Sequence, residues 1–258
     1  EPVYEDLTLT LNWEFLANAI ETMLPEVLYD NVTLPTNKYV DEKNVAVKWE
    51  SSDPTTVSKT GVTNPLREDA IITLTATFTY GGSSIDHKFN VIVPKVEFKD
   101  LSTFKPVFAY VMSFVPFTDT FINTVDVVNV AFGRVQADST VSVSEVKNNL
   151  EKIIQYRKQG IRVVLSLGGN LANFSTAAFT NENRNTFTQS IIELFEQYHL
   201  DGIDLDWEYP GYNTGRDVTV DRPNFTLMVA NLTNAVKAVN EDYLVTAAVP
   251  GGRYGIDR

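Results

Sequence analysis

The stretch Leu200–Pro210 reads LDGIDLDWEYP, and the fold and chemistry expected of the chain follow from it. Three of its carboxylates, Asp204, Asp206 and Glu208, are spaced two residues apart. Because side chains alternate faces along a β-strand, these acids are predicted to share one face of a strand. Like charges this close resist joint ionisation, so each acid raises the pKa of its neighbours. We therefore expect the three acids to keep at least one proton between them at neutral pH.

A protonated carboxyl group beside an ionised one is the arrangement that cleavage of a glycosidic bond requires. With Asp201, the acids also fit the DxxDxDxE signature of family 18 glycoside hydrolases, the chitinase family, which this stretch resembles. The residues around Glu208, reading WEYP, fit the chitinase form as well. The competing interpretation is an acidic strand that faces solvent, and a second motif upstream argues against it.

That second motif is Ser166–Gly169, reading SLGG, which resembles the SxGG motif on the third strand of the same family. On its own it is a weak signal, because Gly-Gly after a strand is usually a turn. Together with the acid motif it is a strong one. The next residue is Asn170, where many chitinases carry tryptophan. This difference predicts weaker stacking on the leaving-group side and argues against crystalline chitin as the substrate.

The resemblance implies a role for each acid. Glu208 would be the general acid that protonates the glycosidic oxygen and then the base that activates water. Asp206 would orient the substrate's 2-acetamido group and stabilise an oxazolinium intermediate, while Asp204 would share a proton with Asp206. The family uses the substrate's own acetamide as nucleophile, an exception to the two-carboxylate scheme. Asp201 is interpreted as structural, and Tyr209 fits the family pattern either as a substrate contact or as packing alone.

The resemblance also implies a lining for the sugar site. Ser166 would hydrogen-bond the carboxylates, and Gly168 and Gly169 would let the backbone approach the sugar. Tyr110 on the first strand would donate to the inner aspartate, with a core aromatic as the alternative. Phe132 on the second strand would line the same pocket.

Residues 101–258 alternate predicted strands with predicted helices, which is typical of the α/β class. The predicted strands are 107–113, 125–132, 161–167, the acidic stretch and 243–249. One predicted helix has Ser144 as its N-cap and ends at Gly160, and apolar periodicity predicts two more over 187–198 and 225–239. The resemblance narrows this class to a (β/α)8 TIM barrel.

About five strands are predicted, whereas a complete barrel needs eight strands and roughly 250 residues. Five strands do not close, and an open sheet would expose apolar surface at its edge. We therefore expect residues 101–258 to be the N-terminal portion of a barrel and the chain to be part of a longer protein. The alternative is a natural half-barrel that pairs with another chain.

Residues 1–100 follow a different pattern. Alternating apolar and polar residues predict strands over 45–49, 71–80 and 88–93, separated by turn-rich segments. A helical segment is predicted over 16–24. The pattern suggests a small antiparallel β-sandwich and resembles the immunoglobulin-like modules of bacterial surface enzymes. We favour a spacer role over glycan binding for this module, and we predict that Trp49 is a core residue.

Composition excludes several classes of partner. The chain has 258 residues, a net charge of −12 and a pI near 4.6, which argue against nucleic acid and anionic membrane surfaces. No apolar run of about 18 residues predicts a membrane span. Without cysteine, and with His87 and His199 lacking ligand-spaced partners, no metal or cofactor is expected. No signal peptide is visible at EPVYEDLTLT, which we interpret as a processed or trimmed start, and the resemblances imply a secreted or cell-surface protein.

Three functions remain open from the sequence, all with an N-acetylglucosamine-containing polysaccharide or glycan as partner. The first is a retaining endo-glycosidase that cleaves β-1,4-linked N-acetylglucosamine in chitin or chito-oligosaccharides. The second keeps this chemistry but acts on the chitobiose core of N-linked glycans, as Asn170 suggests. The third is a glycan-binding protein without turnover, which the incomplete barrel suggests.

Overall fold

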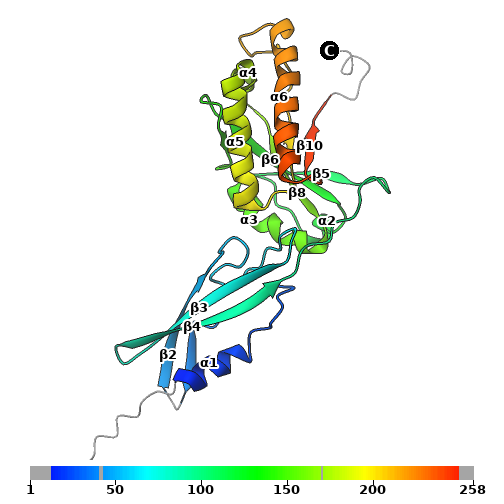
Figure 1. Cartoon of the computed structure of the whole chain (residues 1–258). Coiled ribbons are helices and arrows are strands. Elements are labelled where there is room, and N and C mark those ends of the chain that lie inside the picture. The colour runs from blue at the N-terminus through cyan, green and yellow to red at the C-terminus, as the bar shows by residue number, and fades with distance from the viewer. Residues whose placement is uncertain (1–12, 41–42, 170, 250–258) are drawn as a thin grey trace, which may run out of the picture. The chain divides into compact units, whose positions relative to one another are not determined.

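A computed structural model describes residues 13–40, 43–169 and 171–249 (Figure 1). The chain divides into two compact units, Glu1–Val96 and Glu97–Arg258, each with its own hydrophobic core. The boundary predicted from the sequence falls at residue 100.

The first unit is a four-stranded antiparallel sheet in the order β1-β2-β3-β4. Burial alternates along β2 and β3, because one face of each strand is covered and the other is solvated. The covered face packs against the helix α1 and the loops of this unit. The element bounds are α1 Trp13–Glu21, β1 Asn37–Val40, β2 Lys43–Ser51, β3 Ala70–Tyr80 and β4 Ser83–Val93. The predicted helix and the three predicted strands are confirmed.

Trp49 lies in the core of this sheet, as predicted, and only 4% of its surface is exposed. Its indole Nε1 donates a hydrogen bond to the Pro35 carbonyl oxygen at 2.9 Å, which satisfies the polar atom of a buried aromatic side chain. Its ring also contacts Phe89, with centroids 5.6 Å apart. Trp49 therefore stabilises the module and is not an exposed platform for sugars.

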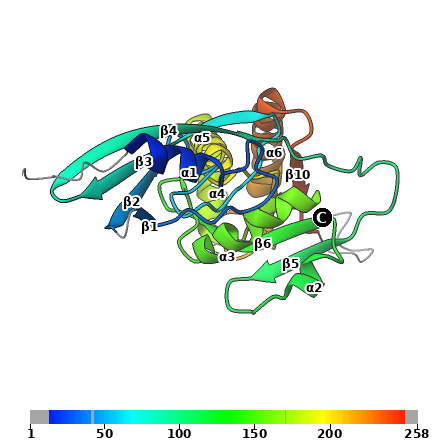
Figure 2. The same ribbon diagram turned by 90° about the horizontal axis from the view of Figure 1, so that it is seen from below.

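The second unit contains five parallel strands in the order β10-β9-β8-β6-β5. Figure 2 shows β6 and β5 side by side at one end of this sheet. Their bounds are β5 Phe108–Met112, β6 Val127–Val135, β8 Arg162–Leu167, β9 Gly202–Leu205 and β10 Leu244–Ala247, and a short β7, Val141–Ser142, pairs antiparallel with β6. The predicted α/β architecture with five strands of a barrel is confirmed.

Helices connect these strands and bury one face of the sheet. The helices α4, α5 and α6 pack against one another, and their apolar side chains share one core with β6, β8 and β9. The bounds are α2 Asp119–Ile122, α3 Lys147–Ile153, a 3-10 helix η1 Ile154–Gln159, α4 Leu171–Phe179, α5 Asn181–Tyr198 and α6 Val218–Val239. Because β5, β6, β8, β9 and β10 are parallel, their carboxyl ends all lie at one edge of the sheet.

Two details of the helices differ from the sequence expectation. The N-cap of α3 is Val146, not Ser144, and it makes no side-chain cap; Ser144 instead accepts a hydrogen bond from Ser142 at 3.2 Å. The end of this helical segment at Gly160 is as predicted, because glycine adopts the left-handed conformation there (φ 78°). The helix α4 was not predicted, since its short sequence LANFSTAAF begins two residues after a glycine pair that resembles a turn.

Asp201 begins the acid motif and forms a buried ion pair with Arg157. The guanidinium Nε and Nη2 donate to the two carboxylate oxygens at 2.9 and 3.0 Å, and the Val163 amide donates to Oδ2 at 3.0 Å. Both side chains are at most 2% exposed. The interpretation of Asp201 as structural agrees with this position at the base of β8 and β9.

We expect Asp201→Asn to lower the free energy of unfolding by about 3–5 kcal/mol, because it removes the negative charge that pairs with the buried Arg157 guanidinium. Urea denaturation followed by circular dichroism measures this loss. The matched control is Glu151→Gln, which removes an exposed i,i+4 pair with Lys147 and should cost about 0.5 kcal/mol or less. Equal denaturation midpoints for the two variants would contradict the structural role.

Candidate active site

The three spaced acids lie at the carboxyl end of β9. The strand ends at Leu205, so only Asp204 belongs to it, and the expectation of one strand carrying all three acids is corrected. Burial decreases along the series, from Asp204 at 1% exposure through a half-buried Asp206 to an exposed Glu208. Asp204 therefore lies in the interior of the sheet, whereas Glu208 lies at the surface.

Trp207 points away from the acids, as alternation predicts. It is 3% exposed and stacks on Phe174 of α4, with ring centroids 5.7 Å apart. The edge of Phe225 from α6 meets it at 5.3 Å. The helices thus hold the chain immediately before Glu208.

Asp204 accepts hydrogen bonds from three hydroxyl groups on three other strands. Tyr110 on β5 and Ser166 on β8 donate to Oδ2 at 2.9 and 2.8 Å, and Thr246 on β10 donates to Oδ1 at 2.7 Å. Ser166 and Thr246 flank Asp204 in register across the parallel sheet. The structure therefore brings the SxGG motif and the DxxDxDxE motif together at the carboxyl group of Asp204.

Asp206, the middle acid, has a raised pKa. Burial raises the pKa of this carboxyl from 3.8 to about 6, and the charges of Glu208 and Asp204 and a hydrogen bond with Glu208 act on the pKa in the same direction. Its Oδ1 is buried and has no hydrogen-bond partner among the described residues. The Asp206 side chain therefore holds a proton more readily than an ordinary aspartate.

Tyr110, which donates to Asp204 from β5, is 43% exposed. Burial of its hydroxyl and the negative charge of Asp204 raise the pKa of Tyr110 to about 12, so it remains a proton donor at neutral pH. The side chain of Asn129 hydrogen-bonds the same hydroxyl from the neighbouring position on β6. Asn129 was not predicted as a site residue, although an asparagine within the apolar run VDVVNVAF was a usable signal.

The glycines of the SxGG motif fit around two side chains of β6. A Cβ atom on Gly168 would lie 2.7 Å from the Phe132 ring, and one on Gly169, where φ is +99°, would lie 2.0 Å from Arg134 Nη1. Arg134 donates to the Gly168 carbonyl at 3.1 Å and pairs with Glu145 at 2.9 Å. Phe132 therefore lies beside Gly168, and its place in the lining of a sugar pocket stays a prediction.

Tyr209 makes no side-chain hydrogen bond to this cluster in the described part of the chain. Tyr209 follows Glu208 directly and is 41% exposed. Asn170 lies outside the described residues. Thr246 contacts Asp204 but was not singled out from the sequence, because a threonine in a strand carries no motif and only the parallel register identifies it.

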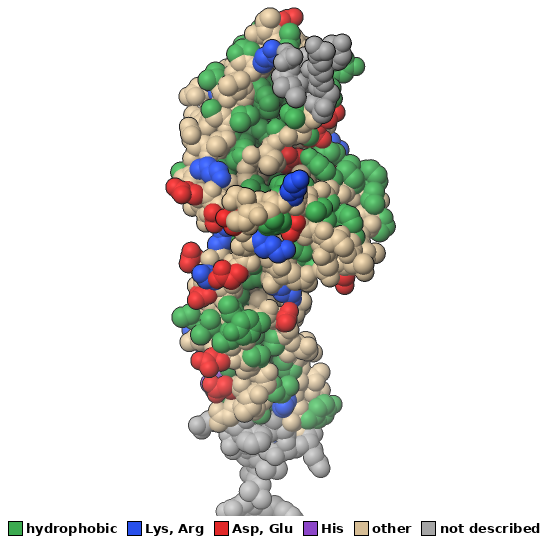
Figure 3. Space-filling model, turned by 90° about the vertical axis from the view of Figure 1, so that its right-hand side faces the viewer, with side chains coloured by type: hydrophobic (Ala, Val, Ile, Leu, Met, Phe, Trp, Pro, Cys, Tyr) green, Lys and Arg blue, Asp and Glu red, His purple; other side chains and the backbone are tan. Residues whose placement is uncertain are grey.

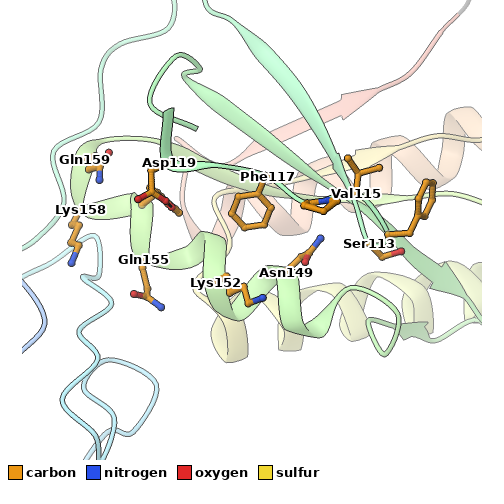
Figure 4. A pocket seen from close by; sticks show the side chains of 12 residues that line it. Ser113, Val115, Phe117, Asp119, Asn149, Lys152, Gln155, Lys158 and Gln159 are labelled. Carbon is orange, nitrogen blue, oxygen red and sulfur yellow. Dashed lines mark hydrogen bonds between the residues drawn. The ribbon is translucent and has the colours of Figure 1, made fainter. Parts of the chain in front are cut away.

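A pocket of about 650 Å³ lies outside the acid cluster, between the loop that follows β5 and the helical segment α3–η1 (Figure 4). Phe117, Asn149 and Lys152 are among its lining residues, whereas none of the predicted site residues lines it. Figure 3 shows that hydrophobic side chains gather in patches on the face of the molecule drawn there. The apolar residues exposed along β5 and its following loop include Phe108, Phe114 and Val115. The chemistry of the candidate site therefore rests on the carboxylates and not on this pocket.

Both parts of the chain match known families. Residues 106–258, more than half of the chain, match the family described as glycosyl hydrolases family 18. Residues 24–96 match the family described as atrophied bacterial Ig domain. Chitotriosidase-1 of Mus musculus is 32% identical over 130 residues, covering 45% of this chain and 27% of that protein. Chitinase A1 of Niallia circulans is 32% identical over 110 residues, covering 39% of this chain and 16% of that protein.

Solved structures resemble the second unit. A glycoside hydrolase family 18 N-acetylglucosaminidase from Paenibacillus barengoltzii is 29% identical with a TM-score of 0.52, covering 59% of this chain and 48% of that chain. A chitinase from Rhizomucor miehei has a TM-score of 0.51 at 24% identity, covering 57% and 47%, and supports the fold alone. The chain thus spans about half the length of these structures and less than a third of the two curated relatives.

Proposed function

Because this chain belongs to glycosyl hydrolase family 18, we propose that the protein is a retaining endo-glycosidase that cleaves β-1,4 linkages between N-acetylglucosamine residues. The observation that carries the proposal is Asp206, a half-buried carboxyl group beside Glu208 whose pKa is raised to about 6. The amide N–H of a 2-acetamido group is a donor from which the Asp206 carboxyl group would accept a hydrogen bond. The substrate class is therefore a sugar that carries this group at the cleaved residue.

The proposed reaction has two steps. In the first, Glu208 gives its proton to the glycosidic oxygen and the bond from C1 to that oxygen breaks, while the acetamide carbonyl oxygen bonds to C1 and forms an oxazolinium ion. Asp206 accepts the acetamide N–H and its negative charge stabilises the cation. In the second step, the Glu208 carboxylate takes a proton from water, and the water oxygen replaces the acetamide oxygen at C1. Two displacements at one carbon retain its configuration.

The inner residues would keep this machinery in place. Asp204 has both oxygens occupied by hydroxyl donors, so it is held as a fixed neighbour of Asp206. Tyr110 stays protonated because of its raised pKa and can donate to Asp204 throughout the reaction. No step requires a metal or cofactor, since the proton donor, the proton acceptor and the nucleophile come from the chain, water and the substrate.

We expect kcat/KM to fall as the pH rises through about 6. The Asp206–Glu208 pair must hold one proton for the first step, and the pKa of Asp206 is raised to about 6, so the pair loses this proton above that pH. The measurement is kcat/KM for a chito-oligomer between about pH 4 and about pH 9. A rate that stays constant from about pH 5 to about pH 9 would exclude a proton held by this pair.

Substrate choice separates the main proposal from its alternative. The relatives named as chitinases and the similar N-acetylglucosaminidase support chitin or chito-oligosaccharides. Asn170, in place of the expected tryptophan, favours the chitobiose core of N-linked glycans. Incubating the protein with chito-oligomers and with a high-mannose glycoprotein, followed by mass spectrometry, decides between them. Binding to either without any turnover would support a glycan-binding protein and overturn both enzymatic proposals.

The proposed setting follows from the substrate. Polysaccharides and glycoproteins of this kind are met outside the cytoplasm, so we place the protein at the cell surface or among secreted proteins. No helix in the described parts of the chain is long and apolar enough to cross a membrane. The immunoglobulin-like unit, with Trp49 in its core, acts in this proposal as a spacer.

A further inference from the structure

The chain contains a buried carboxylate that the proposed reaction does not use. Asp221 lies in the first turn of α6 and none of its surface is exposed. Burial of a carboxyl group is unfavourable unless hydrogen bonds compensate for it. We propose that Asp221 is a positioning residue that fixes the loop 208–216 and thereby holds Glu208 against Asp206. This inference rests on the proposed role of Glu208.

Three donors meet the Asp221 carboxylate. The hydroxyl of Ser175 on α4 lies 2.5 Å from Oδ1. The hydroxyl of Thr214 and the backbone amide of Gly211 lie 2.5 and 2.9 Å from Oδ2. Two of these donors belong to the loop that follows the acid motif and the third belongs to a neighbouring helix. Asp221 therefore ties the loop to the helical layer from the inside.

Packing reinforces the same attachment. Gly211 has φ +82°, and a Cβ atom there would lie 2.5 Å from the Val218 Cα, so the loop backbone lies directly on the start of α6. Arg216 donates to the Ser175 hydroxyl at 2.9 Å, and its guanidinium carbon lies 4.4 Å from the centroid of the Phe179 ring. The Ser175 hydroxyl thus links the positive charge of Arg216 to the buried carboxylate of Asp221.

The position of Glu208 lies between two such attachments. Trp207, on its N-terminal side, is held by the rings of Phe174 and Phe225. Gly211, on its C-terminal side, is held by Asp221. Only Glu208, Tyr209 and Pro210 lie between these anchors, and Glu208 and Tyr209 are exposed. An exposed glutamate keeps its place beside Asp206 because the chain is fixed on both sides of it.

The test compares Asp221→Asn with a matched control at the N-cap of the same helix. Asp217→Ala removes the N-cap of α6, which accepts from the Thr219 amide at 2.8 Å, but Asp217 does not contact the loop donors of Asp221. For Asp221→Asn we expect kcat to fall by about 10- to 100-fold with KM changed by less than about 3-fold, since small misplacements of a reacting group have effects of this size. For Asp217→Ala we expect kcat within about 2-fold of wild type despite a lower melting temperature.

The pH profile gives a readout that a merely structural role would not move. If Glu208 moves away, its charge and hydrogen bond no longer raise the pKa of Asp206. The alkaline limb of kcat/KM should then shift to lower pH in Asp221→Asn and stay in place in Asp217→Ala. Unchanged kcat and an unchanged limb in a folded Asp221→Asn protein would overturn the inference.

A second pair of variants decides the matter if Asp221→Asn does not fold. Thr214→Val removes one donor to Asp221 with little change of shape, and Thr214→Ser keeps the hydroxyl. We expect Thr214→Val to lower kcat and shift the limb, and Thr214→Ser to restore both. Equal behaviour of the two variants would overturn the inference. A wild-type protein that turns over neither chito-oligomers nor N-glycans would instead overturn the proposed function, and this inference with it.

Discussion

Replacing Glu208 with glutamine is expected to lower kcat by about 10²–10⁴-fold while KM stays within about 3-fold of wild type. Glutamine has the shape of glutamate but has no acidic proton to give to the leaving oxygen. Glu208 is exposed at the end of the acid series, so the substitution leaves the core and the Asp204 cluster intact. Steady-state hydrolysis of a chito-oligomer measures the loss.

The nature of the loss identifies the role of Glu208. A glycoside with a good aryl leaving group needs little protonation, so its first step should be slowed much less than that of a chito-oligomer. Glu193→Gln, an exposed glutamate on α5, is the matched control and should keep wild-type rates. Near-normal turnover of chito-oligomers by Glu208→Gln would remove Glu208 from the mechanism.

Asp206→Asn should produce the second large effect, a loss of activity together with a gain of stability at neutral pH. Asparagine cannot stabilise the cationic intermediate with a negative charge, so we expect kcat to fall by about 10²–10³-fold. The same change removes a carboxylate that burial and two neighbouring acids make unfavourable. Kinetics and thermal melts of the same preparations measure the two effects.

The pH dependence of the stability gain has a definite sign. Because the pKa of Asp206 is raised from 3.8 to about 6, the folded state binds its proton more tightly than the unfolded state. The stability that this proton contributes is full below about pH 4 and is lost as the pH rises through about 6. An asparagine side chain does not titrate, so the melting temperature of Asp206→Asn should approach that of wild type near about pH 4 and exceed it near about pH 7.

An exposed aspartate with the opposite shift provides the control. Hydrogen bonds from Thr140 hold the pKa of Asp138 below its usual value, so its ionised form is favoured in the folded state. Asp138→Asn should therefore not raise the melting temperature at neutral pH. A stability gain in Asp138→Asn equal to that in Asp206→Asn would show that general charge reduction, and not the acid series, causes it.

The elements of the fold that sequence predicted share one property, a long and regular apolar pattern. The buried run of β8 and the apolar stripes of α5 and α6 appear where periodicity placed them. The errors lie where local signals compete. Ser144 resembles an N-cap but accepts a hydrogen bond from Ser142. The strand expected from LDGIDLDWEYP ends at Leu205, so Asp206 and Glu208 lie beyond it.

The candidate site divides in a similar way. Ser166, Tyr110 and the acids carry motifs, and the structure places all of them around Asp204 and Asp206. Their catalytic roles stay predictions. Thr246 and Asp221 carry no motif, and each is recognisable only after the sheet register or the packing of α4 on α6 is known. Local sequence thus identifies the reacting groups, whereas the residues that hold them depend on tertiary contacts.

The pairing of Asp201 with Arg157 has a consequence for how this stretch responds to selection. Asp201, at the start of the acid motif, stabilises the folded state through a buried ion pair, while Asp206, later in the motif, is an unfavourable carboxylate at neutral pH. A variant library sorted for heat resistance alone should keep Asp201 and enrich neutral residues in place of Asp206, and so discard catalysis. Sorting for turnover should keep both acids. The residue found at position 206, beside a retained Asp201, would therefore distinguish selection for turnover from selection for stability alone.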